Sequence, residues 1–492
     1  MKYPLVYELN VRCWLRELSA RAGQVIRLGN VPAAEFADWQ ARGFTHVWPM
    51  GLWEVGPRSR TECLANPDLR RACAESLPDF HEADLLGSPY AAAAYRVARE
   101  LGGDAGLRAF RQRLHAAGLK LLVDFVPNHV GLDHPWVHDH PQWFVHSTRP
   151  APETFRQSTD AGELWIAHGK DPNFPAWTDT AQLDYRRPDT RVAVGEALQA
   201  LARRCDGVRC DMAMLLLNDV FVQTWRDFPA SEPPPATEFW AKALRTVKAA
   251  QPDFLFVAEA YWGLEPRLQE LGFDYTYDKQ LYDHVVARDY RGLHRHLATR
   301  PPAFQRASLH FLENHDEPRI ATRLSPAEHR AAALLTLGLP GARLVHDGQL
   351  TGARLRALIQ LGRRPPEPVD PEVQAAYDHL LRALADSAVG HGEGKLLAPR
   401  PAWGENPTWE NFVVVLWQRE APDFDLVVVN LTPCRSQCYA PLEAPNLTQY
   451  NWRLADRLGE ERYERYGDDL ESQGLFLDVP PHAGQLFHFQ PL

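Results

Sequence analysis

The 492-residue sequence lacks several features that would place it in common functional classes. It has no long basic run, and its formal net charge is −10, which argues against nucleic acid as a partner. No apolar run is long enough to cross a bilayer, so we expect no membrane association. The first residues lead directly into an expected strand, and we therefore predict no signal peptide.

Cysteine is scarce, with seven residues scattered along the chain. An odd, scattered set without an export signal predicts reduced thiols and a cytoplasmic location. Cys434 and Cys438 have no second pair that would complete a zinc site, so the sequence favours two free thiols there.

Polar clusters follow four apolar runs. They are Asp124 with Asn128 and His129, then Arg209 with Asp211, then Glu259, and finally Glu313–Asp316. Apolar runs of this kind indicate buried parallel strands that share one polar end. A (β/α)8 barrel places its chemistry at the carboxyl ends of its strands, and we predict this fold. The alternative is an open doubly wound sheet, but no glycine-rich fingerprint follows the first strand.

The pattern divides the chain into three parts. We predict an α/β TIM barrel over residues 1–388, interrupted at residues 131–187 by a small inserted domain rich in Pro, Trp, His and Asp. Residues 389–492 carry short strands with no helices between them, which predicts an antiparallel β-sandwich. A polar insertion over residues 57–84 is too long for an ordinary loop, and we interpret it as part of the active-site rim.

The carboxylates predict acid–base chemistry. Arg209 and Asp211 are two apart on a strand, so both point to one face, and the arginine should lower the pKa of Asp211, as a nucleophile requires. Glu259 precedes Tyr261 and Trp262, and an apolar setting should raise the pKa of a general acid. A retaining glycosidase needs such a pair roughly 5 Å apart. Without catalysis, Arg209 and Asp211 would form a plain buried ion pair, and Glu259 would cap a strand end in solvent.

A hydrolytic metal centre is a second interpretation. Its ligands would be Asp124, His129, Asp211, His315 and Asp316. No His-Glu-x-x-His motif supports it. Loop tryptophans such as Trp262 are placed to stack on sugar faces or simply to pack the loops.

The clusters resemble the conserved regions of the α-amylase family, glycoside hydrolase family 13. The matching segments are 124–129 (Asp-Phe-Val-Pro-Asn-His), 207–211 (Gly-Val-Arg-Cys-Asp), 257–259 (Val-Ala-Glu), 314–316 (Asn-His-Asp) and, more loosely, 182–184. They occur in the family's order, and the resemblance covers nearly the whole chain.

The resemblance implies Asp211 as nucleophile, Glu259 as acid/base and Asp316 as the third carboxylate. It places the other candidate substrate-binding residues around the reacting sugar, namely Tyr90, Asp124, His129, Arg209 and His315. Asn128 stands where many members have a calcium ligand, so the resemblance leaves a structural calcium ion open, and it implies no required cofactor.

Two positions depart from the family. Residues 212–215 are apolar where many amylases have Lys-His, and Ala91 replaces an aspartate of several exo-acting α-glucosidases. We therefore expect retaining hydrolysis of α-glucosidic bonds in intracellular oligosaccharides or disaccharides through a covalent glycosyl-enzyme. Transglycosylation or isomerisation of the trehalose-synthase or glucanotransferase type, phosphorolysis, and a non-catalytic binding protein are the alternatives.

Overall fold

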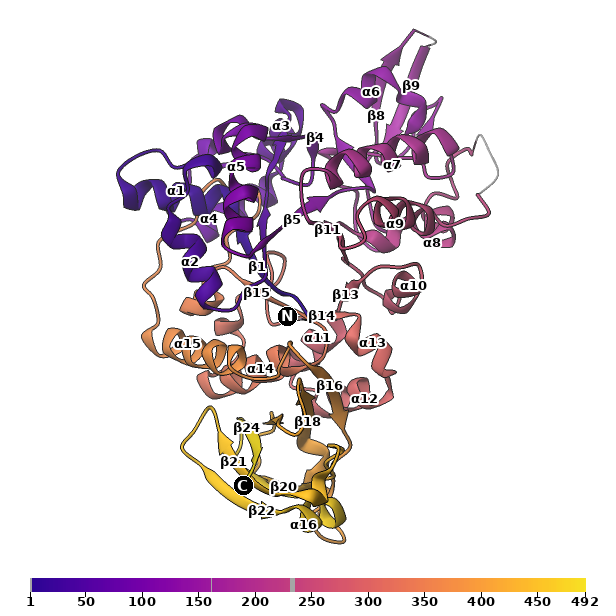
Figure 1. Cartoon of the computed structure of the whole chain (residues 1–492). Coiled ribbons are helices and arrows are strands. Elements are labelled where there is room, and N and C mark those ends of the chain that lie inside the picture. The colour runs from indigo at the N-terminus through magenta and orange to yellow at the C-terminus, as the bar shows by residue number, and fades with distance from the viewer. Residues whose placement is uncertain (1, 161, 231–234) are drawn as a thin grey trace.

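A computed structural model describes residues 2–160, 162–230 and 235–492 (Figure 1). Its centre is a closed barrel of eight strands in the order β1-β15-β14-β13-β12-β11-β5-β2. The strands are β1 (Leu5–Asn10), β2 (His46–Met50), β5 (Lys120–Phe125), β11 (Gly207–Cys210), β12 (Leu255–Ala258), β13 (Tyr275–Tyr277), β14 (Ser308–Phe311) and β15 (Ala342–His346). Neighbouring strands are parallel all round the barrel. The predicted (β/α)8 fold is confirmed, and the open sheet is excluded.

Helices cover the outside of the barrel. The main ones are α1 (Val11–Ala22), α2 (Ala33–Ala41), α5 (Gly103–Ala116), α7 (Pro188–Ala202), α9 (Phe239–Ala250), α11 (Lys279–Ala287), α12 (Tyr290–Thr299), α14 (Pro326–Gly338) and α15 (Pro371–Ala385). Helix α14 begins with a capping box in which Ser325 and Glu328 each bind the other's backbone N–H. Its interior is almost wholly buried because the C-terminal domain packs on its outer face.

Two inserted segments extend from the barrel at the carboxyl ends of its strands. The first contains β3 (Trp53–Val55), α3 (Pro57–Ala65), α4 (Pro67–Ser76) and β4 (Ala92–Val97). The second follows β5 and contains β6 (His129–Gly131), α6 (Pro135–Asp139), β7 (His146–Ser147), β8 (Thr154–Thr159), β9 (Gly162–Ala167) and β10 (Thr180–Gln182). Strands β7, β9 and β8 form an antiparallel sheet that projects from the barrel, and β10 pairs with β6 at its base (Figure 1).

The C-terminal part consists of two antiparallel sheets. One has the order β16-β18-β19-β24-β21-β22 and the other β17-β20-β23. Their bounds are β16 (Glu393–Leu397), β17 (Arg400–Pro401), β18 (Phe412–Gln418), β19 (Phe424–Asn430), β20 (Ser436–Ala440), β21 (Asn451–Asp456), β22 (Arg462–Tyr466), β23 (Leu475–Val479) and β24 (Ala483–Pro491). The two sheets enclose an apolar core of their own, as predicted for a β-sandwich.

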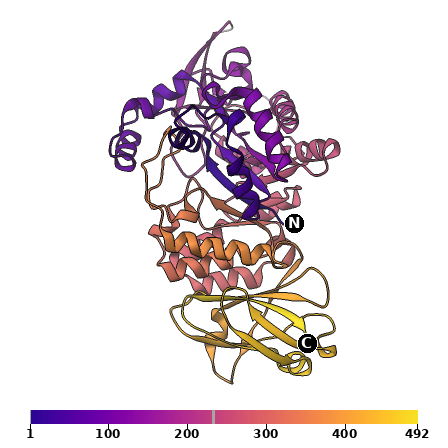
Figure 2. The same ribbon diagram turned by 60° about the vertical axis from the view of Figure 1, so that its left-hand side comes forward.

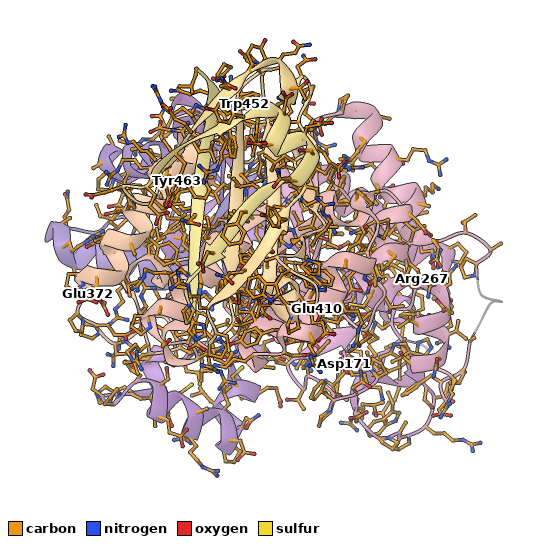
Figure 3. The ribbon with its side chains drawn as sticks, turned by 90° about the horizontal axis from the view of Figure 1, so that it is seen from below. Asp171, Arg267, Glu372, Glu410, Trp452 and Tyr463 are labelled. Carbon is orange, nitrogen blue, oxygen red and sulfur yellow. The ribbon has the colours of Figure 1, made fainter. Side chains whose placement is uncertain are left out.

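The C-terminal sandwich is docked on the barrel beside α14 and α15 (Figure 2). The Trp417 indole donates a hydrogen bond of 2.8 Å to the Gly338 carbonyl at the end of α14. Seen from below, the sandwich with Trp452 and Tyr463 lies in front of the barrel (Figure 3). It therefore covers the outer face of α14 on the side of the barrel, away from the inserted sheet of β7, β8 and β9 (Figure 1). Among the described residues, no helix combines the length and apolarity needed to span a membrane.

Candidate active site

A cavity of about 1150 Å³ opens at the carboxyl ends of the barrel strands. Asp211, Glu259 and Asp316 line it. Asp211 directly follows β11, Glu259 directly follows β12, and Asp316 lies in the loop after β14. Because all eight strands run in one direction, these loops meet at one end of the barrel. The structure thus brings together the three carboxylates that the sequence singled out.

Arg209 on β11 joins two of these carboxylates. Its Nη1 lies 2.5 Å from Asp211 Oδ1, and its Nη2 lies 2.8 Å from Glu259 Oε2. The side chain is 1% exposed and lies beneath the cavity, 3.8 Å from Asp124 Oδ1. Removing charges from water is unfavourable, so a buried ion pair contributes little to the net stability of the fold. The contacts of Arg209 with Asp211 and Glu259 are therefore better explained by a role in catalysis than by a role in stability.

Glu259 accepts hydrogen bonds at both carboxylate oxygens. The backbone N–H of Met212 donates to Oε2 at 2.7 Å, and the Tyr261 hydroxyl donates to Oε1 at 2.7 Å. Met212 has φ +44°, a backbone conformation that residues other than glycine rarely adopt. This conformation turns the Met212 N–H toward Glu259. The carboxylate is therefore held in one orientation by three donors from three residues.

The electrostatics of Asp211 differ from the sequence-based prediction. Burial raises the pKa of Asp211 to about 8, the nearby Arg209 opposes the rise, and the charge of Glu259 adds to it. The prediction of a lowered pKa was wrong because burial of the Asp211 carboxyl group outweighs the attraction of Arg209, whose guanidinium also contacts Glu259.

Asp316 belongs to a second charged group. His315 Nε2 lies 3.0 Å from Asp316 Oδ2, and its Nδ1 binds Glu8, which is fully buried on β1. Burial opposes charge on His315, but Asp316 and Glu8 raise its pKa well above the usual range. Although burial acts against it, the His315 charge holds the pKa of Asp316 low. Asp316 is therefore an ionised carboxylate beside an imidazolium.

Tyr90 and Asp124 support this group from one side. The Tyr90 ring stacks on His315 at 5.4 Å, and its hydroxyl lies 2.9 Å from His315 Nε2 and 3.4 Å from Asp124 Oδ1. Asp124 also accepts a hydrogen bond of 3.2 Å from the Trp48 indole. Burial raises the pKa of Asp124 to about 6. Asp124 lies beneath the cavity, so it supports the lining rather than forming it.

His129 and Trp262 line the cavity on different sides. Burial lowers the pKa of His129 to about 4, so its ring is neutral at pH 7, and it packs 5.0 Å from Trp177. Trp262 is 45% exposed and has φ +64°, which projects the indole from the loop after Glu259. Both are placed to contact a ligand in the cavity.

The side-chain amide of Asn128 is paired with the side-chain amide of Gln182. Asn128 Nδ2 donates to Gln182 Oε1 at 3.2 Å, and Gln182 Nε2 donates to Asn128 Oδ1 at 3.0 Å. Both side chains are buried, so this reciprocal pair uses the oxygen that a calcium ion would need. These residues do not fit a calcium site. Among the described residues, no group of three or more His, Cys, Asp or Glu side chains is placed to hold a metal ion, so the alternative metal centre has no ligand set there.

Several residues of the site were missed by the sequence analysis. Glu8 lies inside an apolar strand, and an acid in such a run is the one signal that marks it. Tyr261 was named from the sequence only as part of an apolar setting, whereas its hydroxyl donates to Glu259. The Tyr277 hydroxyl accepts from Arg209 Nε at 3.2 Å. Lys279 and Arg356 line the cavity from segments after β13 and β15. Their sequence context contains no motif that points to the site.

A (β/α)8 barrel with three carboxylates at one strand-end cavity suits a carbohydrate-active enzyme of the glycoside hydrolase and transglycosylase class. Residues 88–360 match the family described as alpha amylase, catalytic domain, and the chain belongs to this family.

Curated relatives carry two kinds of name. Alpha-amylase MalA of Haloarcula japonica is 25% identical over 279 residues, which cover 53% of this chain and 36% of the relative. The alpha-1,4-glucan:maltose-1-phosphate maltosyltransferase of Burkholderia pseudomallei is 30% identical over 362 residues, covering 71% of this chain and 28% of the relative. The matches thus span about a third of these relatives' length.

Solved structures resemble the whole chain. The maltogenic alpha-amylase AmyB of Thermotoga neapolitana has a TM-score of 0.69 at 19% identity, covering 100% of this chain and 99% of its own. An alpha-amylase from Lactobacillus plantarum has a TM-score of 0.67 at 20% identity, with 99% of both chains covered. At this level of sequence identity, the structural similarity establishes the fold alone.

Proposed function

We propose that this protein cleaves α-glucosidic bonds of neutral oligosaccharides or disaccharides with retention of anomeric configuration. The observation that carries the proposal is the buried Arg209, which holds Asp211 and Glu259 at one cavity floor. A retaining mechanism needs two carboxyl groups close together, one as nucleophile and one as acid/base. The contact of both carboxyl groups with Arg209 supports this pairing.

The reaction proceeds in two displacements. An oxygen of Asp211 attacks the anomeric carbon while Glu259 gives its proton to the glycosidic oxygen, so the leaving sugar departs as an alcohol. Glu259, now ionised, takes a proton from water, and that water displaces Asp211 from the sugar. Met212 N–H and Tyr261 hold Glu259 in place for both steps. Asp316 and His315 bind hydroxyl groups of the reacting sugar.

Transfer to a sugar acceptor is the second candidate function. It uses the same residues and differs only in what displaces Asp211. Trp262, which projects beside Glu259, offers an aromatic face for an acceptor sugar. The apolar residues after the nucleophile and the maltosyltransferase relatives support this alternative.

The charge of the cavity favours a neutral donor. Nine acidic side chains are among the described residues that line it: Glu62, Asp171, Asp179, Asp211, Glu259, Glu265, Asp283, Asp316 and Glu317. The permanently charged cations in this lining are Lys279 and Arg356, and Lys279 already pairs with Asp283 and Glu317. A sugar phosphate would meet net repulsion here. An intracellular sugar remains our expectation, because all seven cysteines are free thiols.

Product analysis tests the proposal. Maltose, maltooligosaccharides, trehalose and sucrose are each incubated with the protein, with and without phosphate, and the first product anomer is read by NMR. Free α-anomer appearing first supports retaining hydrolysis, and longer or rearranged saccharides support transfer. The β-anomer appearing first would contradict a retaining mechanism.

A further inference from the structure

The two sides of the cavity are built differently. Glu259 must protonate the glycosidic oxygen, so the sugar that leaves lies on the side of Glu259. Tyr261 and Trp262 follow Glu259, and Lys279 begins α11 after the next strand, β13. All three line the cavity, so the leaving group is surrounded by loops of β12 and β13.

The opposite side of the cavity belongs to the inserted segment after β2. In the closed barrel β12 lies four strands from β1 in either direction, and β2 is a neighbour of β1. Helices α3 and α4 follow β2 and line the cavity through Glu62, Asn66 and Leu69. We call residues 57–76 the α3–α4 wall. It stands where the part of the substrate that is attached to Asp211 must extend.

One edge of the α3–α4 wall is fastened to the inserted segment after β5. The Ser59 hydroxyl donates to the Asp179 carbonyl at 2.8 Å. The backbone N–H of Arg58 donates to Asp133 Oδ2 at 2.9 Å, and its guanidinium donates to the Leu132 carbonyl at 3.1 Å. These contacts join the α3–α4 wall to the inserted segment on the β5 side of the cavity.

The other edge is fastened to the loop after β15. Ser76 Oγ donates to the Arg356 carbonyl at 2.6 Å. Arg363 binds Asp79 at 2.8 Å and Asp84 at 2.6 Å, just after α4. A small apolar cluster beneath these bonds joins both segments: Cys63, Cys73, Leu77, Leu85 and Leu361. The wall is therefore continuous from the β5 side to the β15 side.

We propose that the α3–α4 wall ends the donor side of the cavity, so that the enzyme acts on non-reducing chain ends and releases short saccharides. This inference rests on the proposed function. In an α-glucosidic bond the attacked carbon belongs to the sugar nearer the non-reducing end, and the leaving oxygen belongs to the next sugar. A chain can extend past Trp262 on the leaving side, but it meets the wall on the other.

Two maltoheptaosides test the inference, each with a chromophore at the reducing end. One has a free non-reducing end, and in the other a cyclic acetal blocks O4 and O6 of the terminal sugar. We expect the free substrate to lose short saccharides from its non-reducing end, and to react at least about 10-fold faster than the blocked one, because the wall leaves no room for added bulk. Asp211→Asn protein gives the background.

The outcomes separate the two proposals. Cleavage of both substrates at internal bonds with similar kcat/KM overturns the chain-end inference and leaves the proposed function intact. No cleavage of either substrate, or of any α-glucoside in the product panel, overturns the proposed function and the inference with it.

A pair of variants locates the effect in the wall. Leu69→Ala shortens a side chain that lines the cavity, and we expect it to narrow the rate ratio between free and blocked substrates. Arg71→Ala on the same helix is the matched control, because Arg71 is exposed and, within the described ranges, pairs with Asp68 in a surface ion pair at 3.2 Å. Thermal midpoints check that both proteins fold. An unchanged ratio in folded Leu69→Ala protein would contradict the role of the wall.

Discussion

At the residue scale, Glu259 is the group whose surroundings explain its role most directly. Its carboxylate accepts from the Arg209 guanidinium, the Met212 backbone N–H and the Tyr261 hydroxyl. These three donors fix the orientation in which Glu259 meets the glycosidic oxygen. We therefore expect activity to depend on them, because a misplaced acid/base transfers its proton poorly.

Tyr261→Phe tests this dependence. Loss of the hydroxyl removes one of the three donors that hold the Glu259 carboxylate. A hydrogen bond to a charged group contributes about 1.5 to 3 kcal/mol, so we expect kcat/KM to fall by about 10- to 100-fold. Tyr185→Phe, which removes a 2.7 Å bond to the Pro127 carbonyl, is the control and should keep its kcat/KM. An unchanged kcat/KM in folded Tyr261→Phe protein would contradict the role of this contact.

Glu8→Gln tests the charge of His315. Because the pKa of His315 is raised in the folded protein, its contribution to stability is complete at acidic pH, persists at neutral pH, and is lost only as pH rises through the raised value. Glutamine removes one of the two carboxylates that hold the imidazolium. In the variant this loss of stability should begin at lower pH. Thermal midpoints measured from pH 5 to 9 show it, and parallel curves for the two proteins would refute it.

At the element scale, strand ends and inserted segments determine what the cavity contains. Strands β11, β12 and β14 present the three carboxylates, while β6 and β10 join the inserted segment to the barrel through their antiparallel pair. The Asn128–Gln182 amide pair lies at that junction. The junction is therefore held by hydrogen bonds between neutral groups.

Calcium removal tests the junction. We expect neither a chelator nor added calcium to change the thermal midpoint or the activity, because the Asn128 oxygen already accepts from Gln182. Asn128→Ala should lower the free energy of unfolding by about 1 to 3 kcal/mol, since the buried Gln182 Oε1 loses the donor Asn128 Nδ2, while Gln182 Nε2 keeps the backbone carbonyls of residues 128 and 183. A thermal midpoint that falls with chelator and recovers with calcium would show that a metal ion contributes at this junction.

Much of this arrangement could be predicted from the sequence, for a physical reason. Asp211, Glu259 and Asp316 each follow an apolar run, and parallel strands bring such positions to one end. Arg209 was predictable from its two-residue spacing to Asp211. Glu8 was not, because it lies 307 residues from His315 and only barrel closure brings them together. The pKa of Asp211 was predicted in the wrong direction because the extent to which its carboxyl group is buried depends on the folded structure.

At the scale of the whole molecule, the charge of the cavity should select among donors. We expect an α-glucosyl phosphate to be processed with a kcat/KM at least about 10-fold below that of a neutral aryl α-glucoside, and the gap to narrow at high ionic strength as repulsion is screened. Steady-state kinetics at low and high salt measure both effects. Equal or better use of the phosphate donor would point instead to a transferase of the maltosyl phosphate type.

The assignment of Asp211 and Glu259 is the central claim, and azide rescue tests it most directly. Each carboxylate is removed in turn, as Asp211→Gly and Glu259→Ala, and each variant is given an activated α-glucoside. Both should lose at least about 10³-fold in activity on ordinary substrates. With azide, Asp211→Gly should yield the β-glucosyl azide, because azide takes the place of the nucleophile. Glu259→Ala should yield the α-glucosyl azide, because azide displaces Asp211 from the covalent intermediate. The opposite anomers, or an Asp211→Gly protein that keeps its activity without azide, would contradict the assignment.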